Sequence, residues 1–264
     1  MGNVRRVTLD LLEQEMTRMR SLLGQAELAR PVPSCPGWDV EALGEHLGRV
    51  HHWAERAVST GAFPGPDYPR AERGGRPLAD WYAARATSLL DVLAAAGPDA
   101  PAWTFQPGEQ HAGFWRRRQL HETTVHRVDA EQALGRSMLG QADDRVDGLT
   151  DAVAADGVAE VLQVFMPRWL WRRRDEPPTD VYPLQRPVAF VCTDVDRAWT
   201  VVLERAADGP GLLVREGRHH PAATISGPAT VLYLAVWGRA PRRLLTLGGD
   251  VDLAADLLDR ALTP

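Results

Sequence analysis

The hydrophobic pattern of this chain changes its period once, and that change limits the possible folds more than any other feature. Over roughly the first 165 residues, apolar side chains recur every three or four positions, which is typical of amphipathic helices. From residue 188 onward they tend to alternate with polar side chains, which is typical of strands. The sequence therefore predicts an α+β protein, with a helical domain at 1–170, a charged, proline-rich linker at 171–185 and a small α/β domain at 186–264.

Residues that favour helix ends support this division. Asp39 is a suitable N-cap for a helix that begins at the next residue, and Gly135 is a suitable C-cap. The expected helices of the first domain lie near 7–29, 40–58, 78–96, 114–135 and 145–166, and helices of this length with short to moderate loops form an antiparallel bundle. The expected elements of the second domain are strands at 188–194, 198–204, 211–216 and 222–227 and helices near 228–238 and 250–262.

Every one of the 30 basic side chains is arginine, because the chain contains no lysine. This excludes a Schiff base, pyridoxal phosphate attachment and a P-loop lysine, and it indicates a GC-rich genome. The net charge of −5 argues against binding of nucleic acid. Two arginine triplets, 116–118 and 172–174, are interpreted as solvated helix faces or as clamps for carboxylates.

The sequence also limits the compartment. It has no apolar run of eighteen residues and no signal-peptide core near its first residue, so we expect a cytoplasmic protein that does not enter a membrane. Cys35 and Cys192 are far apart in the sequence, and in a reducing compartment they are expected to be free thiols, with a structural disulfide as the alternative. Cys35 lies in a turn and is expected to be structural rather than nucleophilic.

Three residues could bind a metal ion. Glu122 and His126 are four residues apart, so both lie on one face of their helix. His46 falls within the apolar stripe of the second helix, where an imidazole needs a partner. If these helices pack together, two nitrogens and one oxygen could bind a divalent ion and leave positions open. The alternative is a pair of hydrogen-bonded core histidines with a helix-surface contact.

Nearby polar residues have two interpretations each. Asp129 follows Glu122 and His126 by seven and three residues, so it either orients a ligand from behind or is a polar interior residue. Arg127 is expected to form a surface or interhelix ion pair. His51 and His52 are expected on the solvent side or rim of their helix.

Four segments resemble the mycothiol-dependent maleylpyruvate isomerase family. They are CPGWDVEALGEHLGRVHHW (35–53), FWRRRQLHETTVHRVDAEQALG (114–135), ADGVAEVL (155–162) and ISGPATVLYLAVWGR (225–239). The resemblance implies a DinB-like four-helix bundle followed by a sterol-carrier-like domain, in an actinobacterial protein. It also implies that His46, Glu122 and His126 bind a divalent metal, with zinc as the expected ion. Arg239 would hold a substrate carboxylate, whereas the alternative is a contact with the end of its own helix.

The implied reaction is the addition of a thiol, mycothiol, to a small electrophilic substrate, with cis–trans isomerisation or thiol transfer as the outcome. The expected partners are therefore a small-molecule substrate and a low-molecular-weight thiol, without nucleic acid or membrane. Two alternatives stay open. One is a noncatalytic protein that binds a small molecule or a partner, and the other is a metal-dependent hydrolase that needs no thiol.

Overall fold

The computed structural model describes residues 4–66, 73–136, 148–172, 186–206, 209–260 and 262. Most of the expected linker, 171–185, and two arginines of the second triplet, Arg173 and Arg174, lie outside these ranges. Within them, no helix combines the length and the apolar character needed to cross a membrane. The chain divides into two compact units, with the division between helices α4 and α5.

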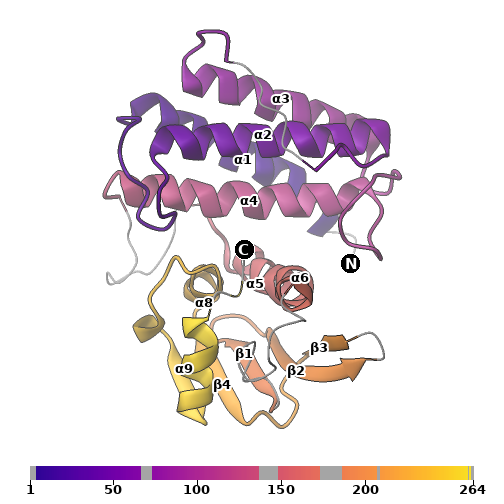
Figure 1. The fold of residues 1–264 in the computed structure, drawn as a ribbon, viewed down its shortest axis with the longest axis vertical. Coiled ribbons are helices and arrows are strands. Elements are labelled where there is room, and N and C mark those ends of the chain that lie inside the picture. Colours follow the sequence, from indigo (N-terminus) through magenta and orange to yellow (C-terminus); the bar gives the residue numbers. More distant parts are fainter. Residues whose placement is uncertain are drawn as a thin grey trace. The chain divides into compact units, whose positions relative to one another are not determined.

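The first unit is a bundle of four helices (Figure 1). They are α1 (Val4–Gln25), α2 (Val40–Thr60), α3 (Leu78–Ala96) and α4 (Ala112–Ala133). Helix α4 packs against α1 and α2, and α3 packs against the same two helices. His46 faces Glu122 while Trp53 faces Trp115, so α2 and α4 run antiparallel.

Local sequence explains how α2 is held in place. The side chain of Asp39 accepts a hydrogen bond of 2.8 Å from the backbone N–H of Ala42, as expected for an N-cap. Gly61 ends the helix in the left-handed conformation, with φ of 64°. Gly48 allows the indole of Trp81 to approach, because a Cβ at this glycine would lie 2.3 Å from the ring. Helices α2 and α3 therefore pack very closely.

The second unit combines a sheet with helices (Figure 1). Its elements are α5 (Asp151–Glu160), a π-helical segment η1 (Val161–Phe165), α6 (Met166–Arg172), β1 (Val188–Cys192), β2 (Ala198–Ala206), β3 (Gly209–Glu216), β4 (Ala223–Gly227), α8 (Ala229–Val236), the short 3₁₀ helix η2 (Arg242–Leu244), β5 (Thr246–Gly249) and α9 (Val251–Asp259). The strand order is β3-β2-β1-β4-β5. Only the β1–β4 pair is parallel among the described strand pairs. The predicted fold class, a helical bundle followed by a sheet-containing domain, is confirmed.

Helices α5 and α6 belong to the second unit, whereas the sequence-based division grouped residues up to 170 with the bundle. Helix α5 packs against α8, and α6 packs against β3. Gly157 allows the contact with α8, because a Cβ there would lie 2.2 Å from the ring of Tyr233. The apolar stripe of a helix shows that one face is buried, but it does not show which neighbour covers that face.

Candidate metal centre

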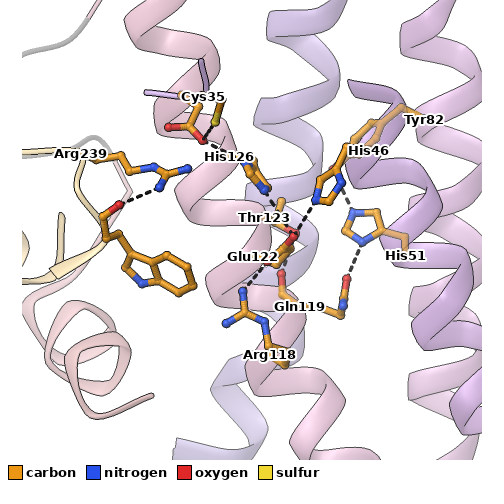
Figure 2. A network of polar contacts seen from close by, with 12 residues as sticks. Cys35, His46, His51, Tyr82, Arg118, Gln119, Glu122, Thr123, His126 and Arg239 are labelled. Carbon is orange, nitrogen blue, oxygen red and sulfur yellow. Dashed lines mark hydrogen bonds and ion pairs between the residues drawn. The ribbon is translucent and has the colours of Figure 1, made fainter. Parts of the chain in front are cut away.

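Helices α2 and α4 bring His46, Glu122 and His126 together (Figure 2). The Nε2 atom of His46 lies 3.2 Å from Oε1 of Glu122, and Nε2 of His126 lies 3.3 Å from the same oxygen. One potential ligand atom of each residue lies within 4.8 Å of the other two. The three side chains keep 10–20 % of their surface exposed.

The spacing of these atoms fits a divalent ion. Ligands about 2.0–2.2 Å from a metal, at tetrahedral or octahedral angles, lie roughly 3.0–3.5 Å from one another. The two nitrogen–oxygen distances of 3.2 and 3.3 Å fall within this range. Two imidazoles and one carboxylate suit zinc and other first-row divalent metals. The residues present therefore fit the divalent metal that the sequence predicts, and an ion held by three protein ligands would have further positions open.

Asp129 lies behind His126, on the side away from Glu122. Its Oδ2 is 2.8 Å from Nδ1 of His126, while its other oxygen accepts a hydrogen bond from Ser34 Oγ. The thiol of Cys35 lies 3.5 Å from Oδ2. An imidazole that donates from Nδ1 has its lone pair on Nε2, the atom that faces His46 and Glu122. The turn that precedes α2 thus supports the orientation of a histidine on α4.

Carboxylates control the charge of His126. Burial lowers its pKa, but hydrogen bonds with Asp129, Cys35 and Glu122 outweigh burial and raise the pKa well above its usual value. A proton on Nε2 of His126 occupies the place of a metal ion, since both would lie between that nitrogen and Oε1 of Glu122. Protons would therefore compete with a metal ion for this site.

Arg118 is the cationic partner of Glu122. Its Nη2 donates a hydrogen bond of 2.5 Å to Oε2, the oxygen that does not face the histidines. Burial raises the pKa of Glu122, but Arg118 and the two histidines outweigh burial and hold this pKa well below its usual range. Glu122 is therefore an anion, as a carboxylate ligand of a metal must be.

The pairing of Arg118 with Glu122 was not predicted, although the four-residue spacing of the two side chains was a usable signal. Among the arginines of the first triplet, Arg118 is the carboxylate clamp, and Arg116 instead donates to the carbonyl of Leu93. Both are buried, so the solvated-face interpretation is wrong for them. Trp38 is a further neighbour of the site that was not predicted. Its ring centroid lies 4.7 Å from that of His46.

The prediction that His51 lies on the solvent side is wrong, because its side chain is fully buried. Nδ1 of His51 lies 2.6 Å from Oε1 of Gln119, and Nε2 lies 3.2 Å from the hydroxyl of Tyr82 (Figure 2). Burial lowers the pKa of His51 from 6.5 to about 4, so this imidazole is neutral at physiological pH. His52, in contrast, is partly exposed and lies 3.1 Å from Glu55.

Other predicted contacts can now be located. Arg127 forms a buried interhelix ion pair, since its Nε donates to Glu15 at 2.6 Å, and it also pairs with Glu131. Both cysteines are free thiols, as expected. Arg239 lies in the second unit, just after α8, and its Nη1 donates to the carbonyl of Trp237 at 2.6 Å. Its role toward a substrate stays a prediction.

Two family models match the chain, one for each unit. The model of the mycothiol maleylpyruvate isomerase N-terminal domain matches residues 9–131, and the model of the MDMPI C-terminal domain matches residues 152–256. Together they cover most of the chain, and the first includes every residue of the candidate metal centre. No curated protein and no solved structure matches the chain. The protein belongs to the mycothiol-dependent maleylpyruvate isomerase family.

Proposed function

We propose that this protein is a metal- and mycothiol-dependent enzyme that adds a thiol to a small electrophilic substrate. The outcome is either cis–trans isomerisation, as the family name suggests, or transfer of the thiol. The observation that carries the proposal is the convergence of His46, Glu122 and His126 within 4.8 Å. Asp129 is hydrogen-bonded to His126, and Arg118 is hydrogen-bonded to Glu122. The family match makes mycothiol the expected thiol.

The donor set favours this chemistry. A bound divalent ion would lower the pKa of a thiol and polarise a substrate carbonyl. Two neutral imidazoles and one carboxylate carry a single negative charge. With a divalent ion bound, these ligands and the ion would keep a net positive charge, which attracts a thiolate. Asp129 holds the ring of His126, and Arg118 holds the carboxylate of Glu122, so both side chains are oriented before a substrate arrives.

The proposed reaction needs no protein nucleophile. The thiolate sulfur forms a C–S bond with one alkene carbon, and the π electrons move to the conjugated carbonyl. The former double bond then rotates as a single bond. Breaking the C–S bond re-forms the alkene in the trans configuration and releases the thiolate unchanged. Burial raises the pKa of Cys192 to about 11, so that side chain is a thiol rather than a thiolate at neutral pH.

The test combines metal content with thiol dependence. Protein purified without chelators is examined by elemental analysis, and its turnover of maleylpyruvate is then measured with and without mycothiol. We expect about one divalent ion per chain, saturable binding of mycothiol and no turnover without it. Turnover without any thiol would favour the hydrolase. A protein without metal or mycothiol binding would be a noncatalytic binding protein.

A further inference from the structure

The two carboxylate oxygens of Glu122 have different partners. Oε1 lies 3.2 Å from Nε2 of His46 and 3.3 Å from Nε2 of His126. Oε2 instead accepts the hydrogen bond of 2.5 Å from Arg118 (Figure 2). One oxygen thus faces the candidate metal position, while a guanidinium occupies the other.

Arg118 is a buried cation that pairs with Glu122. Only 4 % of its side-chain surface is exposed, and the burial of a cation is unfavourable unless an anion or several acceptors compensate for it. The pair also has the i,i+4 spacing that brings side chains together on a helix. Because the guanidinium is almost fully buried, its movement is more restricted than that of a surface arginine. Oε2 is therefore held away from the histidines by a buried guanidinium.

A carboxylate can bind a metal through one oxygen or through both, and the difference changes how many positions stay open. We propose that Arg118 is a positioning residue that restricts Glu122 to one ligand oxygen, and so keeps open the position that its second oxygen would take. That position would accept the thiol or the substrate carbonyl. The inference rests on the proposed function, because it assumes that the three residues bind a divalent ion.

Co(II) provides a spectroscopic probe of the open position. Wild type and Arg118→Met are loaded with Co(II), and binding of 2-mercaptoethanol and of imidazole is followed by visible absorption. We expect Arg118→Met to retain Co(II) as tightly as wild type or more tightly, because Glu122 gains a second bond. We expect it to bind both small ligands at least about tenfold more weakly. Imidazole is neutral, so its weaker binding cannot be attributed to the lost positive charge.

Two variants serve as controls. Arg118→Lys keeps a cation that can donate to Oε2, and it should bind both ligands within about threefold of wild type. Arg117→Met removes a neighbouring guanidinium of the same triplet and should leave ligand binding unchanged. Circular dichroism checks the fold of each variant. A crystal structure of Co(II)-loaded wild type provides a measurement that does not depend on any variant, and we expect one oxygen of Glu122 on the ion.

The possible failures are distinguishable. If wild type binds no Co(II), the proposed function and this inference are both wrong. If wild type binds Co(II) but Arg118→Met binds both small ligands as tightly as wild type does, only the inference is wrong. Loss of Co(II) from Arg118→Met would mean that Arg118 supports metal retention instead. Weaker binding of the thiol alone would assign the effect to charge, and Glu122 bound through both oxygens in wild type would also overturn the inference.

Discussion

His126 Nδ1 lies 2.8 Å from Oδ2 of Asp129, a carboxylate with no solvent exposure. This pairing fixes which nitrogen of His126 is available at the candidate metal centre. It also connects α4 to the turn that precedes α2, because Ser34 and Cys35 contact the same carboxylate.

Replacement of Asp129 by asparagine should weaken metal binding. The amide is a weaker acceptor for the N–H of His126, and loss of such a supporting partner typically lowers metal affinity by about 10–100-fold. Competition with a chromogenic chelator measures the affinity. Ser34→Ala is the matched control, because it removes one hydrogen bond to Asp129 and leaves the partner of His126 in place. Equal metal affinity in Asp129→Asn and wild type would exclude this role.

Replacement of Glu122 should remove the metal, and the choice of substitution matters. Glu122→Gln keeps the shape of the side chain and an acceptor for Arg118 but removes the charge, so we expect loss of metal with a smaller loss of stability than in Glu122→Ala. Glu122→Ala leaves Arg118 without this carboxylate and should lower the free energy of unfolding by roughly 3 kcal/mol, as when a buried ion pair is broken. Elemental analysis and urea denaturation measure the two effects. Glu45→Ala removes a half-buried carboxylate on α2 that pairs with Arg73, and it should leave metal content unchanged and stability nearly so. Full metal occupancy in Glu122→Gln would remove Glu122 from the ligand set.

His51 should make stability depend on pH. Its folded pKa of about 4 lies below the unfolded value of 6.5, so between these values the unfolded chain binds a proton that the folded chain does not. The free energy of unfolding should therefore fall as the pH falls from 6.5 to 4, by about 3 kcal/mol from this residue alone. The difference between wild type and His51→Gln in urea denaturation isolates this contribution. His52→Gln is the control, and the same pH dependence in wild type and His51→Gln would contradict the prediction.

Gly48 and Gly24 provide a matched pair for packing. Gly48→Ala places a Cβ against the indole of Trp81 and should lower the free energy of unfolding by about 1–3 kcal/mol. At Gly24 a Cβ would meet only the Cβ of Ala79, at an ordinary 3.8 Å. Gly24→Ala should therefore stabilise α1 by up to about 1 kcal/mol, through the higher helix propensity of alanine. Thermal unfolding measures both variants, and similar melting temperatures for the two would show that α2 and α3 are less tightly packed.

The cysteines should be dispensable for turnover. Cys192→Ser should retain most activity because Cys192 is buried and protonated, and Cys35→Ser should do so because serine can also donate to Asp129. Omission of mycothiol should eliminate turnover in wild type and in both variants. Activity that needs no added thiol and is lost in Cys35→Ser would instead identify a protein nucleophile.

The sequence predicted most elements of this fold because their patterns are local. The range predicted for the third helix, 78–96, is the observed one, and four strands were found with small errors at their ends. Strand β5 was missed because Thr246–Gly249 has only four residues, two of them glycine, and hence no alternating apolar pattern. Its place at the sheet edge comes from pairing with β4.

The candidate site also has features that follow from local sequence and features that depend on tertiary packing. The spacing of Glu122 and His126 indicated a shared face, but their approach to His46 depends on how α2 and α4 pack. The burial of His51 could not be predicted from α2, since its two partners are Tyr82 on α3 and Gln119 on α4. A polar residue within an apolar stripe can be recognised in a sequence, whereas its partner is set by tertiary packing.

The ion pair between Arg127 and Glu15 has a consequence for the metal centre. Arg127 follows His126 directly and pairs with Glu15 on α1, while the ring of His126 contacts that of His46 on α2. If α4 rotated about its axis and carried Glu122 and His126 away from His46, it would pull a fully buried guanidinium away from its carboxylate. Helix α4 therefore has one strongly preferred rotational setting. Substitutions at Glu15, on a helix that contributes no candidate ligand, are expected to alter the alignment of the site.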